Sequence, residues 1–443
     1  MKFEFTSKAR TLAIVLFVVG LIGVIAGFAT NGAGHHEAAG HEEHATEMTN
    51  GDDHGTHEAS AHNEGHAEEH GHDAELAHHQ QANRPWSALY VNSFFFFCIG
   101  LGSMFFLGVQ YVARAGWSTG LLRIFEAVAF SMVIPGIVLV VIQVLGMAHI
   151  HHMFHWMADG VMDPSSDHYD EIIAGKQGYL NPLFFTLRAA IYLIGWILAA
   201  VMIRKNSLKE DEQGGVEFYK KNVRIAAIFT VFFAVTSSTA AWDWIMSIDT
   251  HWFSTLFGWY TFAGMFVTAL TVLNMLTVYL KEKGYLEWIN VNHLHDLGKF
   301  MFAFSIFWTY LWFSQFMLIW YSNIPEEVTY YMQRFGEYKL LFFTMVTLNF
   351  VFPVLLLMPR DAKRNYALVM FTGIFVLIGH WLDHYIMVMP GTVGPYYGFG
   401  LVEISGFIMY TGLFIFVVFR SLAKAPLMQK NHPMILESKY FHQ

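Results

Sequence analysis

The sequence predicts an all-α integral membrane protein with about ten transmembrane helices. Its 443 residues are 55% hydrophobic and 14% charged, whereas soluble domains carry about 25% charged residues. Ten apolar stretches are each long enough to cross a bilayer, which takes roughly 20 residues. We see no period-two alternation of the kind that marks a transmembrane β-strand.

The ten predicted spans follow one another with mostly short polar connections. They cover residues 11–29, 87–112, 124–148, 182–203, 225–247, 256–280, 300–321, 340–358, 366–389 and 400–419. The fifth and ninth spans end alike, in AAWDWIMSID and GHWLDHYIMV, and lie four spans apart. This spacing favours two four-helix bundles, spans 2–5 and 6–9, with spans 1 and 10 at their flank.

The first predicted helix occupies residues 1–30. A basic start followed by an apolar run also resembles a secretory signal. The run of about 19 residues is longer than the apolar region of such a signal, and no small-x-small cleavage motif follows it. Gly20, Gly23 and Gly27 share one face, which suits close helix packing. We therefore expect an uncleaved helix.

Residues 31–85 form an acidic, histidine-rich insertion. They hold 12 Asp or Glu, one Arg and half of the 24 His residues. Because such a composition buries no core, we expect a disordered loop on the outer face. One interpretation is a weak, multisite binder of zinc, copper or nickel, with candidate ligands His35, His36, His41, His44, His78 and His79. The alternative is a solvated acidic loop whose charge varies with pH.

The basic residues predict the orientation. With the N-terminus inside, 21 of the 26 Lys and Arg residues fall on cytoplasmic segments. This pattern predicts a multi-pass protein of the bacterial inner membrane with both termini in the cytoplasm. Residues 86–425 would form a nine-helix membrane domain, and residues 426–443 a cytoplasmic tail. No basic stripe with interleaved aromatics is present, which argues against a nucleic-acid partner.

The single cysteine, Cys98, restricts the redox chemistry. One Cys builds neither a CxxCH haem attachment nor an iron–sulfur cluster nor a thiolate zinc site. If the protein serves electron transfer, such centres lie in other subunits.

Polar residues within the spans are candidates for function, because ionisable groups in a membrane are energetically costly. In the ninth span, His380, Asp383 and His384 share one helical face. At about 1.5 Å per residue they lie in the outer third of the membrane. Further members of this predicted outer polar layer are Arg188, Asp243, Asp249, His251 and Glu403.

Such a layer suits proton relay or the binding of a quinol headgroup, whose oxidation needs acceptors for two protons. The alternative is that each group is paired or hydrated, with Arg188 and Asp243 as a structural ion pair. On the inner face, Glu126 and Asp296 are candidates for cytoplasmic proton uptake or, alternatively, for helix caps.

Two long aromatic passages carry a family resemblance. They are TSSTAAWDWIMSIDTHWFSTLFGWY at 236–260 and HDLGKFMFAFSIFWTYLWFSQFMLIWYSNIPEE at 295–327. With the N-terminal SKARTLAIVLFVVGLIGVIAGF, they resemble the ActF-type membrane subunits of bacterial alternative complex III, within the wider NrfD (polysulfide reductase) family. The resemblance covers the chain except for the histidine-rich insertion.

The resemblance implies ten helices with two four-helix bundles, and a non-haem subunit of a quinol:cytochrome c oxidoreductase. Such a complex oxidises menaquinol through c-type haems and iron–sulfur clusters held by partner subunits. The implied partners are a multihaem cytochrome c, an iron–sulfur protein, a sister NrfD-like subunit, and cytochrome c or a terminal oxidase as acceptor. The ActF-type subunit would act as scaffold and proton path. The positions that match family motifs are Asp243, Asp249, His251, Asp296, His380, Asp383 and His384.

Three alternative functions remain open at the level of sequence. In the first, the chain is itself the catalytic quinol-binding subunit. In the second it is an ion or metal transporter, and in the third it is a purely structural anchor.

Overall fold

The structure is a computed structural model that describes the backbone of residues 2–46 and 60–442 and the side chains of residues 2–30 and 75–442. Within these ranges the chain is helical and contains no strand beyond an isolated bridge between Lys2 and Pro426. Ten helical segments of the described chain are long and apolar enough to cross a membrane. The protein is therefore an all-α multi-pass membrane protein, as the sequence predicts.

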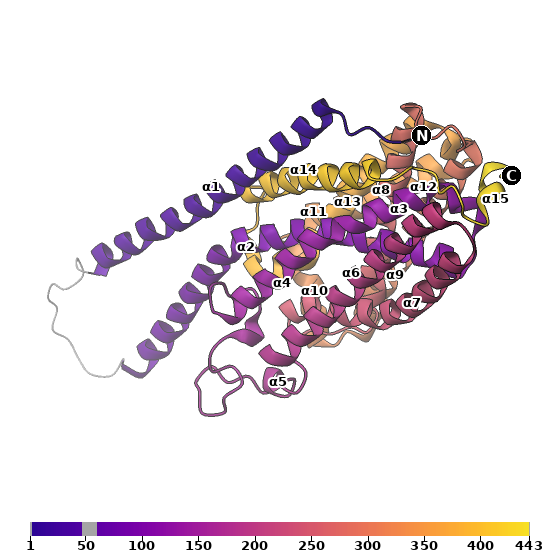
Figure 1. Cartoon of the computed structure of the whole chain (residues 1–443). Coiled ribbons are helices and arrows are strands. Elements are labelled where there is room, and N and C mark those ends of the chain that lie inside the picture. The colour runs from indigo at the N-terminus through magenta and orange to yellow at the C-terminus, as the bar shows by residue number, and fades with distance from the viewer. Residues whose placement is uncertain (1, 47–59, 443) are drawn as a thin grey trace.

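The helices are numbered along the chain in Figure 1. Their bounds are α1 (Ser7–Thr46), α2 (Ser60–Val112), α3 (Leu122–Ala129), α4 (Val133–Met147), α5 (Glu171–Ala174), α6 (Pro182–Gln213), α7 (Glu217–Trp244), α8 (Phe257–Glu282), α9 (Val291–Ser322), α10 (Pro325–Gly336), α11 (Lys339–Val346), α12 (Phe352–Leu357), α13 (Tyr366–Val393), α14 (Leu401–Ala423) and α15 (Ile435–Lys439).

The helices pack as two groups of four spans. The first group contains α2, α3 with α4, α6 and α7, and the second contains α8, α9, α11 with α12, and α13. Helix α2 joins the groups, because it also packs against α8 and α13. The two predicted four-helix bundles are thus present.

Helix α14 pairs along its length with the first part of α1 at the flank of the bundles (Figure 1). A Cβ atom added to Gly20 would lie 2.6 Å from the Cα of Met409, and one added to Gly23 would lie 2.5 Å from the Cβ of Ser405. The predicted packing role of these glycines is confirmed. Both chain termini lie at the same end of the bundle, called here the terminal end (Figure 1).

Two predicted spans are interrupted at prolines. The third span contains a 3₁₀ turn at Phe130–Met132, just before Pro135, and the eighth contains a π turn at Thr347–Val351, just before Pro353. Proline lacks an N–H and its ring displaces the preceding carbonyl, so the regular hydrogen-bond ladder is lost upstream of it.

The predicted disordered loop over 31–85 needs correction. Helix α1 continues to Thr46 and α2 begins at Ser60, so both helices extend beyond the bundle (Figure 1). Residues 47–59 lie outside the described ones. An existing helix can be lengthened without a new nucleation step, and the Ala and Glu residues of this histidine-rich sequence favour such extension. The boundary at 85 is wrong, since Asn83 is already buried against Thr392.

Candidate functional site

A buried polar cluster lies within the second bundle, centred on Asp383 of α13. Its carboxylate accepts hydrogen bonds from the hydroxyl of Tyr260 on α8 and from Nε1 of Trp308 on α9, the latter at 3.0 Å. His380 Nδ1 lies 3.6 Å from Asp383 Oδ2, one turn earlier on the same helix. His380, Asp383 and His384 are each 0–1% exposed. The structure thus brings the predicted triad together and adds two aromatic donors.

The imidazoles of this cluster have spare hydrogen-bonding capacity. His384 Nδ1 faces the carbonyl of His380, but its Nε2 and both ring nitrogens of His380 have no hydrogen-bond partner. No Lys or Arg in the described chain forms an ion pair with Asp383. A buried carboxylate with an adjacent unbonded imidazole suits exchange of a proton between the two.

Two tyrosines of α10 lie between this cluster and the end of the bundle opposite the termini. Tyr330 interacts electrostatically with Asp383, and Tyr331 with Tyr260. Burial raises the pKa of Tyr330 to about 12, although the neighbouring Arg334 opposes this shift. Both phenols therefore stay protonated at neutral pH. Sequence analysis did not single out α10, because its 12 residues are too short to span a membrane.

Arg188 and Asp243 form a separate ion pair in the first bundle. Arg188 Nε and Nη2 each donate to the Asp243 carboxylate at 2.8 Å, and Tyr192 adds a bond at 3.2 Å. The guanidinium also donates to the Tyr179 carbonyl at 2.9 Å and lies over the Tyr179 ring. Because this carboxylate is fully paired, the structural interpretation of Arg188 and Asp243 is the better one.

The loop that follows α7 carries Asp249 and His251. His251 Nε2 lies 2.6 Å from Asp170 Oδ2, at the surface. Burial raises the pKa of Asp170. Hydrogen bonds from the backbone N–H of Ile173 and from the His251 ring lower this pKa, and the net shift is downward. Burial lowers the pKa of Lys176, and the charges of Asp170 and Asp249 oppose this shift. These groups form a polar loop cluster, and Tyr330 of α10 interacts electrostatically with both Asp249 of this cluster and Asp383.

A cavity of about 360 Å³ opens beside this loop cluster. Its wall includes the side chains of Lys176, Tyr179, Trp242, Thr250 and Phe253. Nε1 of Trp242 has no hydrogen-bond partner. The cavity is large enough for a small aromatic ring with polar substituents.

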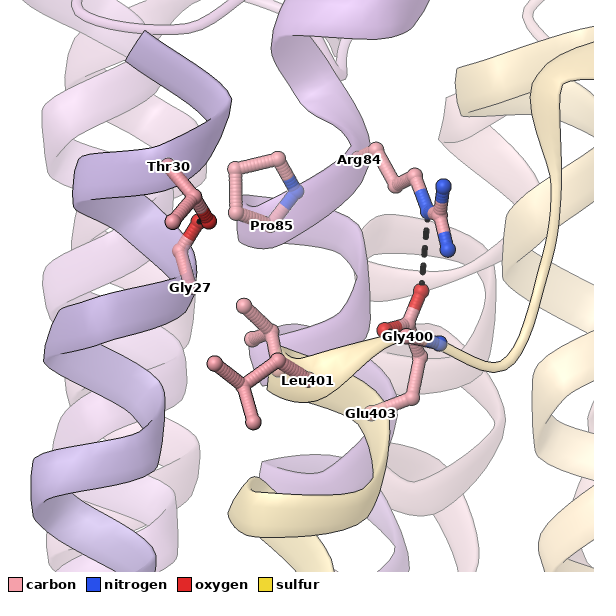
Figure 2. Close-up of a pocket in the computed structure, with 8 residues that line it drawn as sticks. Gly27, Thr30, Arg84, Pro85, Gly400, Leu401 and Glu403 are labelled. Carbon is pink, nitrogen blue, oxygen red and sulfur yellow. Dashed lines mark hydrogen bonds and ion pairs between the residues drawn. The ribbon is translucent and has the colours of Figure 1, made fainter. Parts of the chain in front are cut away.

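Glu403 lies in a different pocket, between α1, α2 and α14 (Figure 2). Arg84 Nε donates to Glu403 Oε1 at 3.1 Å, and the other carboxylate oxygen accepts the Gly400 N–H at 3.0 Å. Glu403 thus caps the first turn of α14 while holding α2 beside it. This arrangement gives Glu403 a structural role.

The two predicted inner candidates are also paired. Glu126 accepts hydrogen bonds from Arg204 at 2.6 Å, Arg123 at 3.3 Å and Gln429 at 3.3 Å. Asp296 forms an ion pair with Lys299 at 2.6 Å. Both acids lie near the terminal end of the bundle, where Glu126 contacts Gln429 of the C-terminal region. The predicted polar residues thus fall into several paired groups.

The predicted metal ligands are only partly described. His35, His36, His41 and His44 lie outside the residues whose side chains are described. His79 lies 3.6 Å from Glu75 and packs against His152, with ring centroids 4.2 Å apart, and His78 packs beside it. Within residues 2–30 and 75–442, no three His, Cys, Asp or Glu side chains form a metal-binding group.

No protein-family model and no curated protein matches the chain.

Several functional candidates escaped sequence analysis. Tyr260 and Trp308 look like ordinary apolar residues of a span. The packing of α8 against α13, and of α9 against α8, places both side chains beside Asp383. Glu210 and Gln429 lie outside the predicted spans, although both are fully buried. The available signal was the run of three acids at residues 210–212 in a loop whose other charges are mostly basic.

Proposed function

We propose that the chain is a membrane subunit, without its own haem or iron–sulfur centre, of a quinol-oxidising respiratory complex resembling alternative complex III. The observation that carries this proposal is the buried Asp383 cluster. It combines a carboxylate without a cationic partner and imidazoles with unbonded nitrogens inside a membrane bundle. Ionisable groups placed there are candidates for function by default, and proton relays are one of their recurring uses.

In this proposal the Asp383 cluster carries protons across the outer part of the membrane. Asp383 receives a proton, and the His380 imidazole, 3.6 Å away, exchanges it after a small side-chain rotation. In this proposal, the hydroxyl groups of Tyr260, Tyr330 and Tyr331 continue the proton path from Asp383 toward the end of the bundle opposite the termini. The electron carriers are haem c and iron–sulfur clusters in partner subunits, and menaquinol is the proposed reductant.

The decisive variant is Asp383→Asn, which keeps the shape of the side chain and removes its charge. We expect quinol:cytochrome c turnover or proton release to fall by about 100-fold or more, the lower end of the range for loss of an acid–base group. Tyr260→Phe should also slow turnover. The matched control is Tyr385→Phe, since Tyr385 lies on the same helix but donates to the Gly398 carbonyl. Unchanged rate and proton stoichiometry in Asp383→Asn would remove Asp383 from the mechanism.

The proposed partners are tested by purification of the tagged chain in mild detergent, followed by mass spectrometry. We expect multihaem and iron–sulfur subunits to travel with it, together with quinol-dependent reduction of cytochrome c. A lone protein without a chromophore would contradict the role as a complex subunit.

A second candidate is that this chain itself binds the quinol headgroup. The cavity beside Trp242 favours it, because an ammonium, hydroxyl groups and aromatic rings surround one space of about 360 Å³. A photoreactive quinone analogue should then label the chain near Trp242, and Phe253→Ala should weaken labelling. Labelling confined to a partner subunit would contradict this candidate.

A further inference from the structure

Glu210 is a buried acid that the proposed function does not use. It lies in the last turn of α6 and is 0% exposed. Neither of its carboxyl oxygens has a hydrogen-bond partner. An ionised carboxylate buried without donors is strongly unfavourable, so such groups are normally paired or neutral.

The positive charges around Glu210 already have partners. Arg204 donates to Glu126, and Arg123 donates to Glu126, Asp211 and the Ser207 carbonyl. These two guanidinium groups balance the two carboxylates of Glu126 and Asp211. Glu210 is close enough to Arg123, Glu126 and Asp211 to interact with them electrostatically. It is the third carboxyl group beside two cations.

The chain after α14, called here the C-terminal segment (residues 424–442), covers this group. Gln429 donates to Ser207 Oγ at 2.8 Å and to Glu126 at 3.3 Å, and Asn431 donates to the Glu210 carbonyl at 3.3 Å. The His432 ring packs on Tyr219, with centroids 5.0 Å apart, and its Nε2 has no partner. The predicted tail is therefore folded onto the bundle.

We propose that Glu210 carries an exchangeable proton at neutral pH, in a site at the terminal end that the C-terminal segment closes. The neutral carboxyl removes the third negative charge from the cluster. When the segment lifts, water reaches Glu210, its O–H bond ionises, and the proton passes to the water. This inference rests on burial and charge balance and not on the proposed respiratory function.

Infrared difference spectroscopy of the purified full chain tests the protonation state directly. At about pH 7, the wild-type spectrum minus that of Glu210→Gln should contain the C=O band of a protonated carboxyl group, shifted in D₂O. The matched control, Asp211→Asn, should instead remove a carboxylate band, because Asp211 is paired with Arg123. A carboxylate band lost in Glu210→Gln would overturn the proposal.

Stability provides a second readout with a defined sign. A group that keeps its proton in the folded state stabilises the protein less as pH rises. From about pH 4.5, where a glutamate of the unfolded chain ionises, to about pH 7, the melting midpoint of the wild type should fall relative to that of Glu210→Gln. Parallel curves would overturn the proposal. So would failure of Glu210→Gln to fold, because glutamine closely matches a neutral glutamic acid in shape.

Removal of residues 428–443 tests the covering role of the segment. Exposure to water should then ionise Glu210, so the protonated band should disappear at about pH 7. If the truncated chain kept this band, the C-terminal segment would not close the site.

Discussion

Removing the charge of Asp243 should destabilise the first bundle strongly. Asp243 is 1% exposed and accepts two bonds of 2.8 Å from Arg188. In Asp243→Asn, the guanidinium keeps one amide oxygen and remains buried without a counter-charge. Breaking a buried pair by removing one partner costs about 3–5 kcal/mol. Because Tyr192 and the Tyr179 carbonyl remain as partners, we expect about 3 kcal/mol of lost unfolding free energy.

The assay is reversible or thermal unfolding of the purified chain in detergent, within a double-mutant cycle. Arg188→Leu and Asp243→Leu should each destabilise, and the double variant should lose much less than the sum of the two. The comparison pair is Arg84 and Glu403, whose arginine is 33% exposed. Arg84→Ala should cost about 1 kcal/mol or less through the lost ion pair. A loss below about 1 kcal/mol in Asp243→Asn would refute the argument that burial makes this pair essential.

Three further changes test other parts of the structure. Gly20→Leu should cost about 1–3 kcal/mol of unfolding free energy by overpacking α1 against α14. The control Val19→Leu, on the exposed face of α1, should be neutral. Equal melting midpoints of the two variants would contradict the packing described. Burial lowers the pKa of His432 to about 4. As pH falls, the unfolded chain therefore binds a proton at His432 before the folded protein does. Up to about 3 kcal/mol of unfolding free energy is lost between about pH 6.5 and about pH 4. His432→Phe should flatten that pH dependence, and an unaltered melting curve would show that His432 is not its source. Deleting residues 35–72, which removes four of the six candidate ligands, should strongly reduce weak multisite zinc binding in a calorimetric titration. Undiminished binding would place the metal elsewhere.

The number and order of spans could be predicted because each depends on local composition. An apolar run of about 20 residues is a property of its own sequence, and each of the ten predicted spans lies, to within one residue, inside one of the ten described helical segments. The helix ends were less predictable. Helix α6 continues to Gln213 although the predicted span stops at 203, since polar residues such as Lys209 remain helical once outside the membrane.

The pairing of polar groups could not be predicted in the same way. Rise per residue places Asp243 and Asp383 at similar depths, but it says nothing about which neighbouring helix each one faces. That depends on helix rotation and on packing between distant parts of the chain. Asp243 meets Arg188 of α6, whereas Asp383 meets Tyr260 of α8 and Trp308 of α9.

This difference in partners separates structural acids from candidate proton carriers. In the described chain, six Asp or Glu side chains are buried: Glu126, Glu210, Asp243, Asp296, Asp383 and Glu403. Four of them form an ion pair with Lys or Arg, and Asp383 and Glu210 do not. A paired acid keeps its negative charge, because protonation would leave the neighbouring cation buried without a counter-charge.

An acid without a cation is free of that constraint and can change its protonation state at a much smaller energetic expense. Asp383 and Glu210 are therefore the two positions at which neutral substitution should alter proton chemistry while sparing stability. They lie in different bundles, with Glu210 on α6 near the terminal end and Asp383 on α13. If Asp383→Asn and Glu210→Gln each destabilised the protein as strongly as Asp243→Asn, this distinction between paired and unpaired acids would be wrong.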